Sequence, residues 1–190
     1  GSIRVGGVDT SQVSDTWTAK NVTLLTQDVH LFAGTLRQDL SMAAQGATDA
    51  ELLRALRHVG LDPEGTQFAR LFPKGLDTAV GAGAEELPPE VEQQLALARV
   101  ALSSPKVLIL DEATAEAGSD ATNTLEEAAA RIAEGTTALV VAHRLDQAAV
   151  ADRILVMDAG RIIEDGTHAE LMAAGERYAQ LFAAWSGGCH

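Results

Sequence analysis

The chain has 190 residues, of which 46% are apolar, enough for one globular domain with a hydrophobic core. Its net charge of −13 argues against binding to nucleic acid or to an anionic membrane surface, because few cations are left to neutralise phosphates. The single cysteine, Cys189, excludes a disulfide framework and fits a reducing cytosol. No apolar run approaches the roughly 18 residues of a membrane span and no basic-then-apolar leader opens the sequence, so we expect neither.

The N-terminal stretch predicts short elements that lead to a polar loop. Residues 3–5 before a Gly-Gly pair predict a short strand and turn, and residues 14–20 predict a short helix. The β-branched and apolar residues 22–26 predict a core strand, which brings Gln27 to the point where a strand meets a loop. An amide at such a place can coordinate a metal or orient a water, whereas the plainer alternative is a surface glutamine.

Residues 35–99 predict a helical block without strands. A capping box at Thr48–Glu51 opens one helix, and a further helical stretch covers Gln67–Phe72. A glycine-rich loop follows at residues 75–84. Residues 88–102 then predict a longer helix, since the Pro-Pro pair at its start suits a first helical turn. Because this block has apolar faces of its own, we expect a helical subdomain inserted between strands.

Four apolar residues, 107–110, run directly into Asp111 and Glu112. The run predicts a strand buried on both faces of a parallel sheet, ending in the crevice where α/β proteins bind ligands. Two acids there suit a magnesium nucleotide: one holds the hydrated metal and the other takes a proton from an attacking water. The alternative is a buried strand followed by an acidic turn, in which Glu112 is merely solvated.

The rest of the chain alternates helix and strand. Residues 119–133 predict a helix that ends before Gly135, and residues 137–142 predict a second buried strand that ends at His143. This alternation favours a parallel sheet. The remaining predicted elements are a hairpin over residues 154–164 at the edge of that sheet, a capping box at Thr167–Glu170 and a final helix over about residues 176–185.

Three predicted strands thus end at Gln27, at Asp111-Glu112 and at His143. By itself, His143 would more often be a hydrogen-bonded structural histidine. Its placement beside a metal ligand and a base, at the same kind of strand end, indicates a nucleotide site instead.

The order of these motifs resembles the nucleotide-binding domain of ATP-binding cassette (ABC) transporters, of the exporter type fused behind a transmembrane domain. Residues 25–35 resemble the Q-loop segment, residues 106–114 Walker B, residues 141–145 the switch-histidine segment and residues 160–168 the hairpin beyond it. The resemblance covers nearly the whole chain.

The resemblance implies an α/β fold: a P-loop NTPase (RecA-like) core with a mainly parallel sheet, truncated at its N-terminus, plus an inserted α-helical subdomain and a C-terminal hairpin and helices. The core would comprise residues 1–34 and 100–190, and the helical subdomain residues 35–99.

The resemblance also implies ATP and Mg²⁺ as ligands and ATP hydrolysis coupled to translocation. Gln27 would contact Mg²⁺ and the attacking water, and Asp111 would hold the magnesium shell. Glu112 would act as the general base, and His143 would hold the γ-phosphate.

The phosphate-binding motif Gly-x-x-x-x-Gly-Lys-Ser/Thr is absent from the sequence. In the family it precedes the segment matched by residues 1–5. We therefore expect an N-terminally truncated domain that alone binds Mg-ATP weakly or not at all and is inactive by itself. Gly1-Ser2 is either a tag remnant or native.

Two partner-facing motifs depart from the family pattern. The signature Leu-Ser-Gly-Gly-Gln aligns with Leu87, Pro88, Pro89, Glu90 and Val91. The two prolines offer no N–H, and Glu90 adds negative charge where an anion should dock. The loop after Walker B is Ala115, Glu116, Ala117 and Gly118, with glycine in place of the family's aspartate.

These changes lie on surfaces offered to a partner, whereas the residues that act on this chain's own nucleotide are intact. We therefore predict one half of an asymmetric heterodimer at the cytoplasmic face of the cell membrane. Its partners would be a non-identical nucleotide-binding domain and a transmembrane domain, and not nucleic acid. Two alternatives are a regulatory pseudo-ATPase half and an ABC ATPase outside transport.

Overall fold

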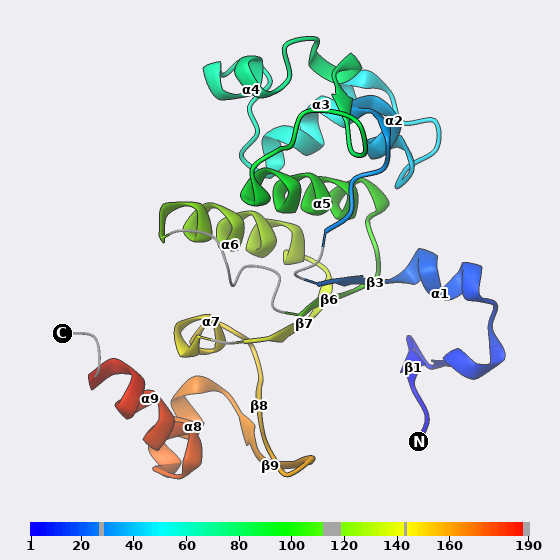
Figure 1. Ribbon diagram of the computed structural model, residues 1–190. Helices are drawn as coiled ribbons and strands as arrows, with labels where there is room; N and C mark the ends of the chain where they lie inside the picture. Colours follow the sequence, from blue (N-terminus) through cyan, green and yellow to red (C-terminus); the bar gives the residue numbers. More distant parts are fainter. Residues whose placement is uncertain (27–28, 112–118, 143, 188–190) are drawn as a thin grey trace. The chain divides into compact units, whose positions relative to one another are not determined.

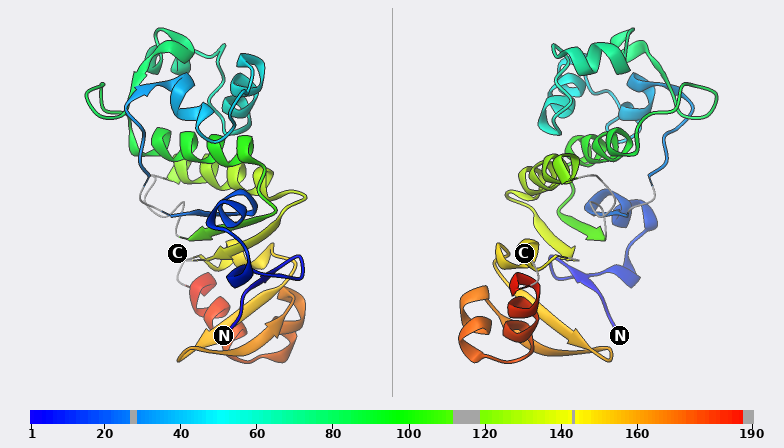
Figure 2. Two further views of the ribbon diagram at one scale, coloured as in Figure 1. Left: turned by 90° about the vertical axis from the view of Figure 1, so that its right-hand side faces the viewer. Right: turned by 60° about the vertical axis from the view of Figure 1, so that its left-hand side comes forward.

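The computed structural model describes residues 1–26, 29–111, 119–142 and 144–187 (Figure 1 and Figure 2). The chain divides into two compact units, unit 1 with residues 1–141 and unit 2 with residues 142–190. The described elements of unit 1 are β1 Arg4–Val5, β2 Val8–Asp9, η1 Thr10–Gln12, α1 Asp15–Asn21, β3 Val22–Leu25, β4 Gly34–Thr35, α2 Leu36–Ser41, α3 Asp49–His58, α4 Thr66–Leu71, η2 Gly75–Asp77, β5 Ala79–Val80, α5 Pro89–Ser103, β6 Val107–Asp111, α6 Ser119–Ala133 and β7 Thr137–Val141. Those of unit 2 are α7 Leu145–Ala149, β8 Ile154–Asp158, β9 Arg161–Gly166, α8 His168–Ala174 and α9 Arg177–Gly187.

A three-stranded parallel sheet forms the centre of unit 1, in the order β3-β6-β7. Leu25 pairs with Leu110, and Asp111 pairs with Val141. The predicted α/β fold class with a parallel sheet is confirmed. The predicted division into a core and a helical subdomain stays a prediction.

One face of this sheet packs on helices. Leu108 and Leu110 belong to the same buried cluster as residues of α5 and α6. On the other face, Leu24 and Leu139 both pair with Ile109 and are 58% and 53% exposed. The prediction that β6 is buried on both faces is therefore wrong for one face, because a strand alternates its side chains and the described helices cover the Leu108 side.

Strand β7 forms where residues 137–142 predicted a strand, but the prediction of burial is wrong. All five of its residues are exposed. The reason is its place in the sheet: among the described strands it pairs with β6 alone and lies at the edge of the ladder.

The main core lies between the sheet and the helices α2 to α6. The helix starts follow local sequence: complete capping boxes open α2 at Thr35 and α3 at Thr48, and proline opens α5. The prediction that residues 35–99 lack strands is wrong, because β4 pairs antiparallel with β5. Gly34 and Val80, which pair here, lie far apart in the sequence, so local sequence patterns do not predict this pairing.

Unit 2 holds the predicted hairpin of β8 and β9 and the two following helices. Ala159 and Gly160 turn the chain with positive φ values of 44° and 76°. The hairpin forms a two-stranded sheet from β8 and β9, and its predicted place at the edge of the parallel sheet stays a prediction. A small core of Ile154, Leu171 and Tyr178 holds the unit together.

Candidate functional site

The carboxyl ends of the three parallel strands meet at one edge of the sheet, with Asp111 in the middle strand. Neighbouring strands lie about 4.8 Å apart, so the last residues of β3, β6 and β7 lie close together. Asp111 is half-buried. Three predicted site residues, Gln27, Glu112 and His143, come one or two positions after the strands and lie outside the described residues, as does the predicted loop at 115–118. Their proximity stays a prediction.

Asp111 is the predicted magnesium ligand whose place is described. A single carboxylate at a strand end fits Mg²⁺, which keeps several waters and takes one or two protein carboxylates beside the phosphates of its nucleotide. Within the described ranges, no group of three or more His, Cys, Asp and Glu side chains could hold a metal ion by itself.

The start of α5 holds the residues predicted to form an altered signature, and its hydrogen bonds show which amides an anion could use. The N–H groups of Val91 and Glu92 both donate to the carbonyl oxygen of Pro88, at 2.9 and 3.1 Å. Pro88 and Pro89 have no N–H. Within this described turn, the amide of Glu90 is thus the one without a hydrogen-bond partner, next to that residue's own negative charge.

The five predicted signature positions divide into two groups. Leu87 packs against the main core, and Val91 is 1% exposed within it. Pro89 is exposed, and Pro88 and Glu90 are half-buried. A ligand at this helix start would therefore meet two proline rings and a carboxylate, which is an unfavourable surface for a phosphate.

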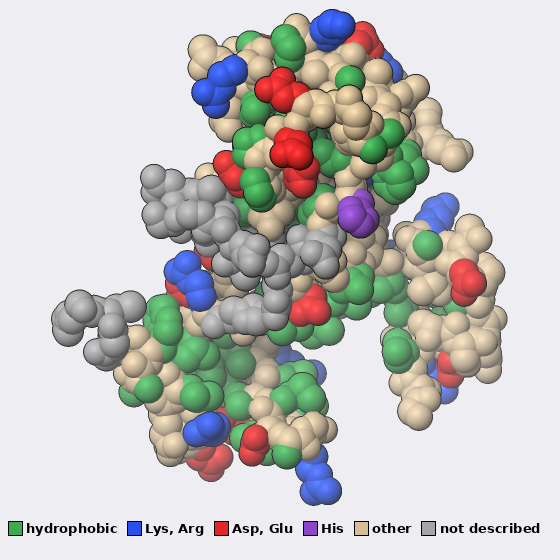
Figure 3. Space-filling view, viewed as in Figure 1, with side chains coloured by type: hydrophobic (Ala, Val, Ile, Leu, Met, Phe, Trp, Pro, Cys, Tyr) green, Lys and Arg blue, Asp and Glu red, His purple; other side chains and the backbone are tan. Residues whose placement is uncertain are grey.

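Acidic side chains are spread over the helical part of unit 1 on the face shown in Figure 3. They agree with the net charge of −13. No helix within the described ranges is both long and apolar enough to cross a membrane.

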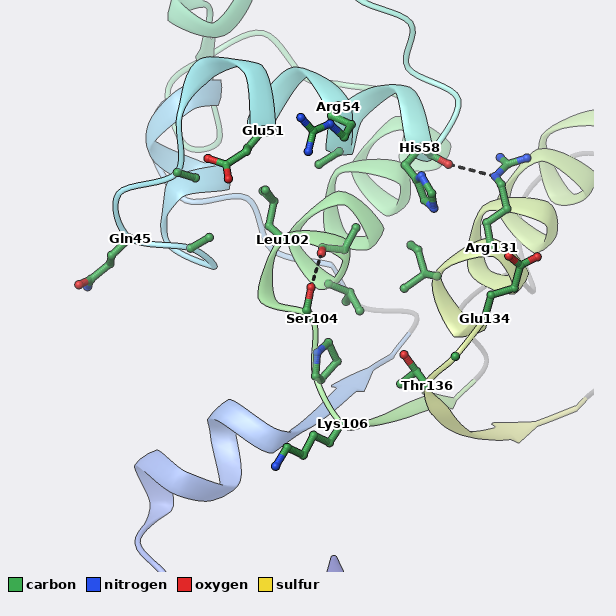
Figure 4. A pocket seen from close by; sticks show the side chains of 18 of the residues that line it. Gln45, Glu51, Arg54, His58, Leu102, Ser104, Lys106, Arg131, Glu134 and Thr136 are labelled. Atoms are coloured by element: carbon green, nitrogen blue, oxygen red, sulfur yellow. Dashed lines mark hydrogen bonds between the residues drawn. The ribbon is translucent and has the colours of Figure 1, made fainter. Parts of the chain in front are cut away.

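A cavity of about 890 Å³ opens at the other edge of the sheet, beside Lys106 before β6 and Thr136 before β7 (Figure 4). Arg131 of α6 points toward the end of α3. Its Nε donates a hydrogen bond at 3.2 Å to the carbonyl oxygen of His58, the last residue of that helix. Because this cavity lies at the amino ends of the strands, it is separate from the Asp111 edge. Its charged lining is mixed in sign: Glu51, Arg54, Lys106, Arg131 and Glu134.

Sequence reasoning missed an ion pair between α2 and α5, in which Asp39 is buried and the Arg99 side chain is 17% exposed. Both carboxylate oxygens of Asp39 lie near Nη1 of Arg99, at 2.8 and 3.0 Å. The signal in the sequence is an acid between Leu36 and Leu40, on the side of α2 that is buried. The partner could not be read in the same way, since it lies 60 positions further along the chain.

The family model described as "ABC transporter" matches residues 1–115. An ATP-dependent lipid A-core flippase of Bordetella avium is 38% identical over 183 residues, which are 96% of this chain and 30% of the flippase. A multidrug efflux ATP-binding/permease protein of Mycobacterium bovis is 38% identical over 189 residues, which are 100% of this chain and 16% of that protein.

Among solved structures, a bacterial Atm1-family ABC exporter with ATP bound superposes with a TM-score of 0.82. Its sequence is 30% identical, and the match covers 97% of this chain and 32% of the exporter chain. The chain thus spans about a third or less of the length of these proteins.

Proposed function

Because the chain belongs to the ABC transporter family, we propose that it is the ATP-binding and ATP-hydrolysing domain of an exporter. The observation that carries this proposal is the meeting of three parallel strand ends at Asp111. The similarity to the ATP-bound Atm1-family exporter supports it. In the whole protein, the domain would work at the cytoplasmic face of a membrane beside a transmembrane domain.

In this proposal, the residues at the strand ends position the reactants and stabilise charge, which accounts for most of phosphoryl-transfer catalysis. Asp111 and Gln27 would hold Mg²⁺, which supplies charge neutralisation at the phosphates. Glu112 would take the proton from the attacking water. His143 would hold the γ-phosphate oxygens.

We further propose that this chain is one half of an asymmetric pair with a second, non-identical nucleotide-binding domain. The support is the start of α5, where Pro88, Pro89 and Glu90 leave little for a phosphate. In a homodimer, each of the two nucleotides would meet the altered start of α5 from the other copy, so neither site would have a normal signature. With a different partner, a normal signature would complete the site around Asp111, and α5 would face only the partner's nucleotide.

The experiment is ATP turnover by the full-length pair with Glu112→Gln in this chain. We expect turnover to fall by at least about a hundredfold, because a general base contributes about 10²- to 10⁴-fold. The matched control is Glu134→Gln, an exposed acid at the far edge of the sheet, which should keep turnover within about twofold.

Three outcomes would contradict these proposals. Full turnover by the pair with Glu112→Gln would show that Glu112 is not the general base. ATP binding without any turnover in single-turnover assays of the wild-type pair would assign the chain to a regulatory half instead. A pair that needs a restored signature in α5 for any activity would overturn the asymmetric arrangement.

A further inference from the structure

The segment of residues 29–35, which begins two positions after Gln27, is held to α2 by a buried carboxylate. The side chain of Asp39 is 0% exposed, and its Oδ1 accepts a hydrogen bond from the backbone N–H of Phe32 at 3.0 Å. A buried carboxylate is costly unless it is paired and hydrogen-bonded. Asp39 therefore needs both Phe32 and a cation in fixed positions.

Arg99 of α5 supplies that cation and contacts the same segment. Its Nη1 lies 2.8 and 3.0 Å from the two oxygens of Asp39, and its Nη2 donates to the carbonyl oxygen of His30 at 3.1 Å. Its guanidinium carbon lies 5.9 Å from the centre of the Phe32 ring. One planar side chain thus contacts this segment at two residues as well as α2, a geometry that a lysine ammonium cannot reproduce.

Helix α5 connects Arg99 to the altered signature. Arg99 lies nine positions after Glu90, which is about 14 Å along a helix. The buried residues of this helix run from Val91 to Val100, and a close-packed interior transmits a displacement from one end of such a stretch to the other. Its most deeply buried residues are Val91, Leu95, Ala96, Leu97 and Ala98.

The loop before α5 rests on the same segment. Gly34 and Thr35 pair with β5, and Gly81 follows with a φ of +76°. A Cβ at Gly81 would lie 2.6 Å from the carbonyl oxygen of Phe32, so the two backbones touch. Residues 29–35 are therefore joined to both ends of the stretch from β5 to Arg99.

We propose that Arg99 and Asp39 are positioning residues, which hold segment 29–35 and α5 in one fixed relation. The segment that follows Gln27 and the first turn of α5 then move together when nucleotide binds. This inference rests on the proposed function, because only that function puts a nucleotide beside segment 29–35 and another beside the first turn of α5. It adds that the Arg99–Asp39 pair links segment 29–35 to α5 itself, whereas β5 and Gly81 join that segment to the loop before α5.

We expect the Arg99–Asp39 pair to fix the position of segment 29–35 more than it raises the free energy of unfolding. Replacing a buried pair by apolar residues of similar volume is often neutral or stabilising. The double variant Arg99→Met/Asp39→Leu should therefore keep the fold and lose the directional contacts to His30 and Phe32. This separation makes the two roles measurable.

The first experiment is hydrogen exchange by the full-length pair, with and without ATP, in a Glu112→Gln background so that hydrolysis does not interfere. In the parent, ATP should change the exchange of residues 29–35 and of the amides of residues 90–94 together. With Arg99→Met/Asp39→Leu, the change at residues 29–35 should remain and the change at residues 90–94 should be lost. A joint response that survives in the double variant would overturn the proposal.

The second experiment measures kcat and KM of the pair with Glu112 intact. We expect kcat to fall roughly ten- to hundredfold at an unchanged KM, because a misplacement of about 1 Å far from the chemistry can cost that much. Arg99→Lys, which keeps the charge beside Asp39, should fold and show a smaller fall in kcat. If the double variant does not fold, Arg99→Lys provides the test, because a wild-type kcat in Arg99→Lys would overturn the proposal.

The matched control is the exposed pair of Arg153 and Asp165 in unit 2, joined at 2.7 and 2.6 Å. Arg153→Ala/Asp165→Ala should leave both readouts unchanged. ATP binding is measured separately. If the wild-type pair does not bind ATP, the proposed function fails, whereas ATP binding with a joint response in Arg99→Met/Asp39→Leu contradicts this inference alone.

Discussion

The helices α3 and α5 share the core of unit 1, yet their first turns are satisfied in different ways. At α3, the Thr48 hydroxyl accepts from the N–H of Glu51, and the Glu51 carboxylate accepts from the N–H of Thr48 at 2.7 Å. Side chains thus complete the hydrogen bonds that the helix leaves open.

At α5, no side chain caps the first turn. Pro88 and Pro89 remove two donors, and Val91 packs into the core immediately afterwards. The helix therefore begins by packing and by proline geometry. The difference teaches that a helix can keep its start in the fold while losing the amides that an anion would need.

The largest expected effect comes from giving α5 free amides, with the variant Pro88→Ser/Pro89→Gly/Glu90→Gly. In the full-length pair carrying Glu112→Gln, ATP should stay bound against α5 roughly ten- to hundredfold longer. Each N–H bond to a charged acceptor contributes about 1.5–3 kcal/mol, and about 1.4 kcal/mol is tenfold in affinity. Retention of labelled ATP after dilution measures this.

A single variant, Glu90→Gln, separates charge from amides in that experiment. It removes the negative charge and leaves both prolines in place, so it should lengthen retention by less than the triple variant. Equal retention in wild type and triple variant would show that the prolines of α5 do not limit binding by the pair.

The next largest effect is expected from removing the side-chain cap of α3. Thr48→Ala removes the acceptor of the α3 cap and should lower the free energy of unfolding by about 1 kcal/mol. Urea unfolding followed by tryptophan fluorescence measures it. Thr48→Ser keeps the hydroxyl and serves as the control. A loss with serine as large as with alanine would rule out the cap as the cause.

Local patterns predicted the elements that local chemistry decides. The capping boxes at Thr48 and Thr167, the Pro-Pro start of α5 and the turn at Ala159-Gly160 all involve residues within a few positions of one another. The same holds for Asp111, because four apolar residues followed by an acid predict a strand and its end.

The features that were missed depend on distant partners. The pairing of β4 with β5 and the ion pair of Arg99 with Asp39 each join residues far apart in sequence. The exposure of β7 depends on what packs against it rather than on its own apolar residues. The joint position of Gln27, Glu112 and His143 stays a prediction, because these residues lie outside the described ranges.

The smallest expected effect sharpens the comparison through pH. The Thr48 backbone N–H and then its hydroxyl, both donating to Glu51, hold the pKa of that carboxyl below its ordinary 4.5. A pKa lowered by folding adds stability that is present above pH 4.5 and is lost as pH falls through the folded pKa. The difference in unfolding free energy between wild type and Glu51→Gln should therefore be constant near neutral pH and shrink in acid. Thr167 lowers the pKa of Glu170 in the same way at α8, so Glu170→Gln is the matched variant and should shift with the same sign. Urea unfolding between pH 7 and 3 measures both, and a difference that does not change over that range would mean that ionisation of the capping acid adds nothing to the start of α3.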